Sequence, residues 1–288
     1  MAGAPAAMIE GLLEPGSEIY SLLGNLVVVS VLMTGLWLVS IVVHDASIVD
    51  IFWGMAFVAI VWAQYARAWV LQGPACLPEQ CDGGAYPPAT ALIVPILVTI
   101  WGLRLSFYLA WRNLGKGEDQ RYVRMRERIG PRFPLISLFV VFLLQALLAW
   151  VVALPAQVAT AMIPTGAPLA LAGFGLWALG LAFETVGDLQ LAAFKRDPQN
   201  QGQVMDRGLW RYTRHPNYFG DFCVWWGIFL IAASIGAWWT VIGPILMSIL
   251  LIRVSGAGLL EQTIGERRPG YADYSRRTSG FLPRPPRP

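Results

Sequence analysis

Charge is scarce in this sequence. Only 14% of its 288 residues are Asp, Glu, Lys or Arg, whereas 56% are hydrophobic, and the mean hydropathy is +0.54. A soluble domain averages about 25% charged and about 45–50% apolar residues. This chain has too few charged residues and too many apolar ones to be a water-soluble globular protein. The composition therefore indicates an integral membrane protein. We expect no nucleic-acid partner.

Cysteine and histidine are also rare, with three and two residues. Cys76 and Cys81 lie in a loop expected outside, where an oxidising environment permits a disulfide; whether they pair stays open here. A metal site is disfavoured because this pair has no second pair and no nearby His. Cys223 falls within an apolar run and is expected in the core. A cleavable leader is not expected, because acidic residues precede the first apolar run.

Long apolar runs account for most of the chain. Each is long enough, or nearly so, for the 17–25 residues that a spanning helix needs. The seven runs cover residues 20–43, 48–71, 89–111, 134–154, 168–187, 218–235 and 237–252. We therefore predict an all-α polytopic protein, with an extramembrane segment over residues 1–18 and a single seven-helix membrane domain over 19–288. The Pro-rich tail from Pro283 to Pro288 is predicted to be disordered.

The basic residues are strongly segregated. Nineteen of the 21 Lys and Arg residues fall between runs three and four, between runs five and six, or after run seven. The exceptions are Arg67 and Arg104. With seven spans, the positive-inside rule places the N-terminus outside and the C-terminus in the cytoplasm.

One basic stretch, Arg207–Asp221, separates two apolar runs. Pro216 cannot lie inside a preceding helix, and it pushes His215 toward an extended conformation. The pattern predicts an extended arm that turns into a helix near Asn217. Cations beside a helix N-terminus favour an anion such as phosphate. The alternative is a loop that only sets topology.

Ionisable residues inside the predicted spans form further groups, since such residues are costly in a membrane and usually face a cavity. On helix two, Asp50 is either an interfacial cap or a cavity-facing acid that donates a proton. A helix-three stripe with spacings of three and four residues comprises Trp101, Arg104, Tyr108 and Arg112, and continues to Arg121 and Tyr122. It indicates a polar pocket, and the alternative is that Arg104 snorkels toward the interface.

Two groups complete the set. Glu184, Asp188 and Lys195 share a line if helix five continues past Gly187. Tyr274 follows Glu261 in a C-terminal segment that is either an amphipathic interface helix or a lid. All groups are predicted on the cytoplasmic side, whereas a transporter places such groups near the midplane. This asymmetry favours an enzyme over a transporter or scaffold.

The region from Glu184 to Pro283 resembles the C-terminal domain of the membrane steroid 5-alpha-reductase family, in its bacterial branch. Asp50-x-x-Trp-Gly54 and the stretch 101–122 also resemble that branch. The resemblance implies seven helices that enclose NADPH from the cytoplasmic side, with a cofactor-binding half over about 168–283. It also implies hydride transfer to an enone whose ketone is polarised by an acid and a tyrosine.

The resemblance also implies residue roles. Asp50 falls near the proton-donating acid of the family, and we expect Tyr108 or Trp101 to assist it as a catalytic residue. Tyr108 also matches the cofactor-binding face of helix three in that family. Asn217 corresponds to the asparagine that binds the nicotinamide amide. The remaining cofactor-binding residues are expected to be Arg104, Arg112, Arg121, Tyr122, Glu184, Asp188, Lys195, Trp210, Arg214, His215, Tyr218, Asp221, Glu261 and Tyr274.

Two departures affect the expected chemistry. Trp101 stands where steroid reductases carry a catalytic tyrosine, and an indole donates a hydrogen bond but cannot act as an acid. Val49-Asp50 replaces a Gln-Glu pair.

The Arg-His-Pro-Asn-Tyr-x-Gly core is also similar to that of isoprenylcysteine carboxyl methyltransferases, which bind S-adenosylmethionine. The density of cations favours NADPH, because adenosylmethionine is itself positively charged.

The sequence therefore predicts an NADPH-dependent reductase in the bacterial inner membrane with a cytoplasmic-facing site. It would act on an activated C=C bond of a steroid, sterol, isoprenoid or similar lipid that enters from the bilayer. The alternative is a methyltransferase that uses S-adenosylmethionine. No metal is expected, and the sequence leaves the substrate and the oligomeric state open.

Overall fold

The computed structural model describes residues 17–72, 89–160, 168–254 and 270–287, and every named element in these ranges is a helix. The chain divides into two compact units, Met1–Thr165 and Gly166–Pro288. Each unit is described by itself below.

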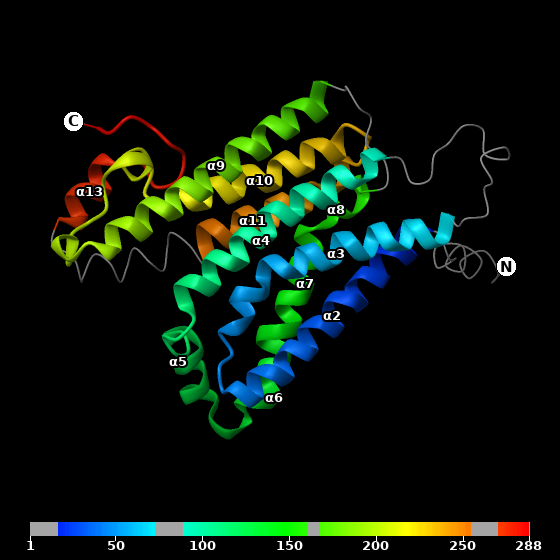
Figure 1. The fold of residues 1–288 in the computed structure, drawn as a ribbon, viewed down its shortest axis with the longest axis horizontal. Helices are drawn as coiled ribbons and strands as arrows, with labels where there is room; N and C mark the ends of the chain where they lie inside the picture. The colour runs from blue at the N-terminus through cyan, green and yellow to red at the C-terminus, as the bar shows by residue number, and fades with distance from the viewer. Residues whose placement is uncertain (1–16, 73–88, 161–167, 255–269, 288) are drawn as a thin grey trace, which may run out of the picture. The chain divides into compact units, whose positions relative to one another are not determined.

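Unit 1 begins with two long helices and a third that follows a short 3₁₀ turn. α2 covers Glu18–Val43, α3 covers Ile48–Gln72, and η1 (Ala89–Leu92) leads into α4 (Ile93–Asn113). α3 packs against both α2 and α4 (Figure 1). Ser17 starts α2 by accepting a hydrogen bond from the backbone N–H of Tyr20, which supplies one of the partners that a helix N-terminus lacks.

A nearly continuous helical run completes unit 1. It consists of α5 (Gln120–Ile129), η2 (Gly130–Arg132), α6 (Phe133–Ser137), the π-helical η3 (Leu138–Leu143), α7 (Leu144–Val152) and α8 (Leu154–Ala159). The sequence pattern predicts no helix between residues 111 and 134, where α5 lies. The prolines of the run fall at the starts of η2, α6 and α8, where a missing N–H breaks no helical bond.

The core of unit 1 lies where α3 crosses α4. Gly54 and Gly102 bring the two backbones together, because a Cβ on Gly54 would lie 2.3 Å from the carbonyl oxygen of Gly102. Phe57 and Trp101 beside this crossing are 0% exposed. Small residues at a helix crossing are typical of membrane bundles, where close packing replaces hydrophobic driving force.

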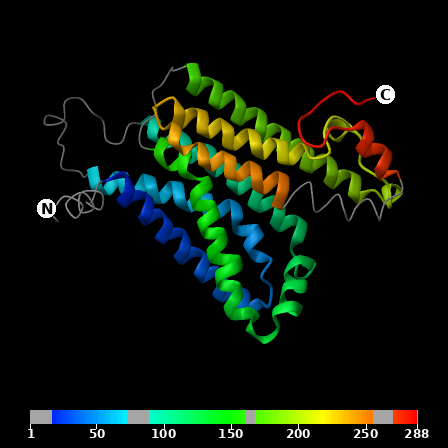
Figure 2. The same cartoon turned by 180° about the vertical axis from the view of Figure 1, so that it is seen from behind.

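Unit 2 is built on two helices, α9 (Pro168–Arg196) and α10 (Pro216–Ala233), which lie side by side in both views (Figures 1 and 2). The other named elements of this unit are η4 (Pro198–Asn200), η5 (Gly208–Arg211), η6 (Trp238–Val241), α11 (Ile242–Ile249), the π-helical η7 (Leu250–Val254) and α13 (Tyr271–Arg277). α9 continues past Gly187, so Glu184, Asp188 and Lys195 all lie on one helix.

A glycine seam joins α9 to α10. Gly173, Gly180 and Gly187 recur every seventh residue on α9, and they meet Gly227, Gly220 and Pro216 of α10. A Cβ on Gly180 would lie 2.5 Å from the carbonyl oxygen of Gly220, and one on Gly173 would lie 2.7 Å from that of Gly227. The repeat of seven keeps one face of each helix against the other.

Five helices in the described ranges are long and apolar enough to cross a membrane. They are Glu18–Val43, Ile48–Val70, Ile93–Asn113, Gln120–Val152 and Pro168–Arg196. Large apolar side chains such as Val31, Val42 and Phe107 point outward, with 66–77% of their surface exposed. The chain is therefore an integral membrane protein. The other two predicted spans correspond to α10 and the shorter apolar helix Trp238–Arg253, so the count of seven and the orientation stay predictions.

Candidate functional site

In unit 1, Asp50 lies in the first turn of α3 and accepts two hydrogen bonds from α5. Arg121 Nη2 donates to Asp50 Oδ2 at 2.6 Å, and the Tyr122 hydroxyl donates to Oδ1 at 2.9 Å. The Asp50 side chain is 22% exposed and Tyr122 only 6%. A carboxylate and a phenol in direct contact, mostly shielded from water, form a group that can share and deliver a proton.

The turn between α2 and α3 fixes α5 beside Asp50. Glu118 Oε1 accepts a hydrogen bond from the backbone N–H of Ala46 at 2.8 Å, and Arg126 pairs with both oxygens of Glu118. Asp119 then caps α5 by accepting from the backbone N–H of Arg121 at 2.8 Å. These contacts aim the first turn of α5, and therefore Arg121 and Tyr122, at Asp50.

Arg121 also sets the charge state of the cap. Partial burial acts to raise the pKa of Asp119, but hydrogen bonds from the side chain and backbone of Arg121 outweigh it. The pKa of Asp119 consequently lies below its usual range. Asp119 thus stays charged and keeps Arg121 in position.

The hydroxyl of Tyr122 has a second neighbour. Gln145 Nε2, on α7, donates to it at 3.4 Å, a weak contact. The hydroxyl thus accepts from Gln145 while it donates to Asp50. This places Tyr122 between two polar groups inside an apolar helical bundle.

The helix-three stripe shares one face of α4, as the spacing predicts. The guanidinium groups of Arg104 and Arg112 each lie 5.7 Å from the centroid of the Tyr108 ring. Trp101 is 0% exposed and packs edge-to-face on Phe57 at 5.3 Å. Within the described residues, Asp50 is hydrogen-bonded by Arg121 and Tyr122, whereas neither Trp101 nor Tyr108 contributes a bond to it.

In unit 2, the basic arm, here Arg207–His215, is anchored on α9. Trp210 Nε1 donates to the carbonyl oxygen of Gly187 at 3.0 Å, and Gln190 Oε1 accepts from the backbone N–H of Leu209 at 2.9 Å. The arm is not extended throughout, because η5 curls residues 208–211 into a 3₁₀ turn. That turn carries Trp210 to the α9 backbone.

The C-terminal segment runs beside the arm. The Tyr274 hydroxyl donates to the carbonyl oxygen of Trp210 at 2.6 Å, the N–H of Arg214 to that of Ser279 at 2.9 Å, and the N–H of Arg284 to that of Tyr212 at 3.0 Å. The prediction of disorder is therefore wrong for residues 283–287, which is explained by backbone pairing that composition does not reveal. The Tyr274 side chain therefore binds the backbone of the arm.

The arm ends at the N-terminus of α10, one residue from the predicted start. His215 precedes Pro216 with an extended φ of −140°, and its ring stacks on Tyr218 at 5.3 Å. Asn217 Nδ2 donates to Asp188 Oδ1 at 3.2 Å. Asn217 Oδ1 is buried and has no hydrogen-bond partner. The carboxamide is therefore oriented by α9, with a shielded acceptor oxygen left for a ligand N–H.

The charges near this carboxamide are of both signs. Glu184, Asp188 and Asp221 are only 3%, 4% and 8% exposed, whereas Lys195 lies exposed in the last turn of α9. Arg214 is partly buried, and a Cβ on Gly280 would lie 2.9 Å from its Nη2. In the ranges the structure describes, no three His, Cys, Asp or Glu residues are grouped to hold a metal ion.

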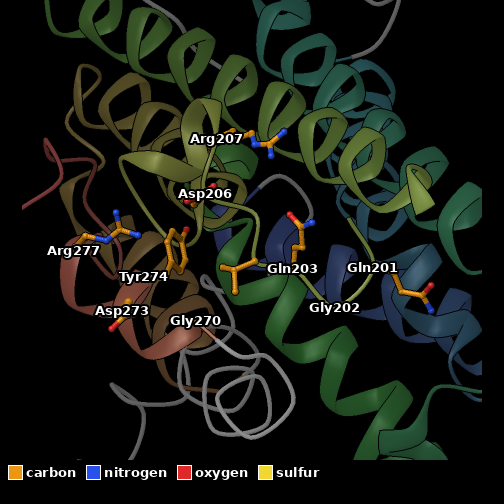
Figure 3. Close-up of a pocket in the computed structure, with 10 residues that line it drawn as sticks. Gln201, Gly202, Gln203, Asp206, Arg207, Gly270, Asp273, Tyr274 and Arg277 are labelled. Atoms are coloured by element: carbon orange, nitrogen blue, oxygen red, sulfur yellow. The ribbon is translucent and has the colours of Figure 1, made fainter. Parts of the chain in front are cut away.

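An open cavity of about 700 Å³ lies between loop 201–207 and α13 (Figure 3). Arg207 and Arg277 line it together with Asp206 and Asp273, and Tyr274 is the predicted site residue that reaches it. Its volume falls in the range of ligand pockets, although its walls are polar. Glu261, Cys76 and Cys81 lie outside the described residues.

Sequence reasoning did not pair Tyr122 with Asp50, nor Asn217 with Asp188. The partners are 72 and 29 residues apart, so no local spacing relates them. Asp50 was identified as a candidate because it is an ionisable residue in a predicted span. Tyr122 was expected to bind the cofactor and not to contact Asp50. These contacts are known only from the fold, which brings α5 to Asp50 and α10 to Asp188.

Comparisons with known proteins match one family over most of the chain. The DUF1295 family, described as a protein of unknown function, matches residues 36–278. An uncharacterised protein of Schizosaccharomyces pombe is 26% identical over 281 residues, which cover 82% of this chain and 76% of that protein. The probable O-methyltransferase ustE of Ustilaginoidea virens is 38% identical over 58 residues, 20% of each chain. No solved structure matches the chain significantly.

Proposed function

The chain belongs to the DUF1295 family, and we propose that it is an NADPH-dependent membrane reductase. It reduces an enone or a similar activated C=C bond in a steroid, sterol, isoprenoid or other lipid-like substrate from the bilayer. The observation that carries the proposal is the contact of Asp50 with Tyr122 in a membrane-spanning bundle. Ionisable residues in such segments are costly and are retained for function.

The cofactor assignment rests on unit 2. When bound, NADPH supplies the hydride. Asn217 presents its buried Oδ1 to the cofactor carboxamide and is oriented by Asp188. Arg214 and the N-terminus of α10 bind phosphate, because guanidinium groups and free helix N–H groups both favour that anion. Lys195 adds a second cation at the end of α9.

The substrate chemistry rests on unit 1. The Tyr122 hydroxyl, which here donates to Asp50, would turn its proton to the carbonyl oxygen of the enone and so draw electron density from the C=C bond. Arg121 holds Asp50 through a 2.6 Å ion pair. The Tyr108 ring lies on α4 with the cations of Arg104 and Arg112 beside it, and Trp101 supports that face of α4 from the core. We place the site on the cytoplasmic face of a bacterial inner membrane.

A second candidate function has support of its own. The stretch that is similar to a probable O-methyltransferase suggests a methyl transfer from S-adenosylmethionine. The buried carboxylates Glu184, Asp188 and Asp221 fit that cofactor, because its sulfonium and ammonium groups are positive. For a hydroxyl acceptor, the Asp50–Tyr122 pair would then take up the proton that the oxygen loses on methylation, whereas a carboxylate acceptor loses none.

One experiment separates the two activities. Purified protein in detergent is given a 3-oxo-4-ene steroid with NADPH, and NADPH oxidation is followed by absorbance. A parallel reaction contains labelled S-adenosylmethionine and a prenylated cysteine. The reductase proposal expects substrate-dependent NADPH oxidation with the C=C bond reduced. Methyl transfer without NADPH oxidation would replace it with the second candidate.

A further inference from the structure

A polar cluster that the proposed function does not use lies far along α3 from Asp50. It joins Asn25 of α2, Gln64 and Arg67 of α3, and Gln157 of α8. Asn25 and Gln157 are 0% exposed. The helical rise of 1.5 Å per residue puts Arg67 about 25 Å along the axis from Asp50. Because α3 is long enough to span, the cluster and Asp50 belong to opposite faces of the membrane.

Hydrogen bonds fix the orientation of the side-chain amides in this cluster. Asn25 Nδ2 donates to Gln64 Oε1 at 2.7 Å and to Gln157 Oε1 at 2.9 Å, and Gln157 Nε2 donates to the carbonyl oxygen of Trp150 at 3.0 Å. Both amide hydrogens of Asn25 are therefore used, so its Oδ1 is the atom that accepts from Arg67 Nη2 at 3.0 Å. The cluster is built to hold a guanidinium.

The Arg67 guanidinium has few partners among the described residues. Among the residues that the structure describes, no carboxylate lies within ion-pair distance of it, and its buried Nε has no hydrogen-bond partner. The guanidinium packs directly on Gly24, where a side chain would not fit because its Cβ would lie 2.4 Å from Nη1. A guanidinium has five N–H donors, and those left for a ligand are the Nη hydrogens that do not bond Asn25, because Nε is buried.

The position of Arg67 identifies the ligand chemistry. Arg67 lies in the last turn of the span Ile48–Val70, the depth at which lipid headgroups begin. A charge in a span is costly unless an opposite charge answers it. Phosphate is the anion present at that depth, and arginine binds it through two parallel hydrogen bonds. Gln64 offers Nε2 as a further donor, since its Oε1 is occupied by Asn25.

We propose that Arg67, seated on Gly24 and oriented by Asn25, binds the phosphate of a membrane phospholipid at the membrane face opposite Asp50. The bound lipid fastens α2, α3 and α8 together at that face. This binding site does not depend on which reaction the chain catalyses.

Native mass spectrometry of the full-length protein in detergent tests the site. The protein is titrated with phosphatidylglycerol, with diacylglycerol of the same acyl chains, and with inorganic phosphate. The wild type is expected to bind phosphatidylglycerol and to leave diacylglycerol unbound. Arg67→Gln should weaken phosphatidylglycerol binding about tenfold or more, since charge-assisted bonds are lost. Arg124→Gln, which removes an exposed arginine of α5, is the matched control and should bind as the wild type does.

Three results would overturn the proposal. The first is equal phosphatidylglycerol affinity in the wild type and in Arg67→Gln. The second is diacylglycerol binding as tight as that of phosphatidylglycerol. The third is full competition by inorganic phosphate at equal concentration, which assigns the site to a soluble anion. If Arg67→Gln does not fold, Arg67→Lys decides, because it keeps the charge and loses the paired geometry; unchanged affinity there contradicts the proposal.

Discussion

Tyr122 and Asp50 are 72 residues apart in the chain, yet the phenol oxygen of one lies 2.9 Å from the carboxylate of the other. The contact joins the start of α5 to the start of α3, two elements that Glu118 and Asp119 align. In the reductase that we propose, the Tyr122 hydroxyl of this pair would supply the proton that activates the substrate carbonyl.

Removal of the Tyr122 hydroxyl tests that role. Tyr122→Phe should lower kcat for enone reduction about 10²–10⁴-fold, the usual contribution of a positioned acid or base. The affinity for NADPH should stay within about twofold, since the cofactor is assigned to unit 2. Steady-state kinetics and a separate cofactor titration measure the two effects.

Tyr20→Phe serves as the control for this substitution. Tyr20 lies exposed near the start of α2, and the same hydroxyl is removed from a different place in unit 1. Its kcat should equal that of the wild type. A Tyr122→Phe enzyme as active as this control would remove Tyr122 from the mechanism.

Asn217 offers a test of the cofactor site. Asn217→Ala removes the buried acceptor Oδ1 together with the hydrogen bond that Asn217 donates to Asp188 Oδ1. The affinity for the cofactor should fall about tenfold, as expected for one lost hydrogen bond in a shielded site. Asn200→Ala changes an asparagine of the same unit that bonds the Phe194 carbonyl instead, and it should leave cofactor affinity unchanged. Equal affinities in both variants would refute the assignment of Asn217.

The glycine seam predicts a sharp difference between two alanine substitutions. Gly220→Ala places a Cβ 2.4 Å from the backbone N of Glu184, and a backbone atom cannot move aside. It should destabilise the protein by about 1–3 kcal/mol or more, the usual cost of overpacking. Thermal unfolding in detergent measures the effect.

Gly175→Ala is the matched control on α9. Nothing lies within 4 Å of a Cβ at Gly175, and alanine is favoured over glycine inside a helix by about 1 kcal/mol. This variant should be neutral or slightly more stable. Equal melting temperatures in the two variants would show that α9 and α10 do not approach as closely as the seam requires.

Acid should weaken the cap of α5. The folded-state pKa of Asp119 lies below its unfolded value of about 3.9. Its contribution to stability is therefore complete above about pH 3.9 and is lost as the pH falls through the lower, folded-state pKa. The wild type should melt slightly higher than Asp119→Asn at neutral pH, and the difference should shrink below about pH 3.9. A difference that stays constant down to about pH 2 would show that the charge of Asp119 does not stabilise the fold.

Sequence patterns located the apolar helices well, because a long apolar run in a membrane protein can adopt few structures other than a helix. The start of α10 was placed within one residue, since Pro216 restricts both itself and His215. The shared face of Arg104, Tyr108 and Arg112 also followed from helical spacing. These features depend on local rules.

The remaining features depend on contacts between distant segments. α5 was missed because its residues are polar and arginine-rich, which hydropathy assigns to a loop. The tail after Pro283 was called disordered from composition, whereas its backbone pairs with the arm through Tyr212. The partner of Asp50 could not be predicted, since nothing in the local spacing relates it to Tyr122.

Cofactor-dependent stabilisation is the most direct measurement of the central claim that this membrane protein binds NADPH. A ligand that binds only the folded state raises the melting temperature, by about 2.7 kcal/mol of added stability at a hundredfold excess over Kd. NADPH should raise the melting temperature of the wild type and raise that of Asn217→Ala less, while S-adenosylmethionine should leave both unchanged. A shift with S-adenosylmethionine and none with NADPH would contradict the reductase proposal.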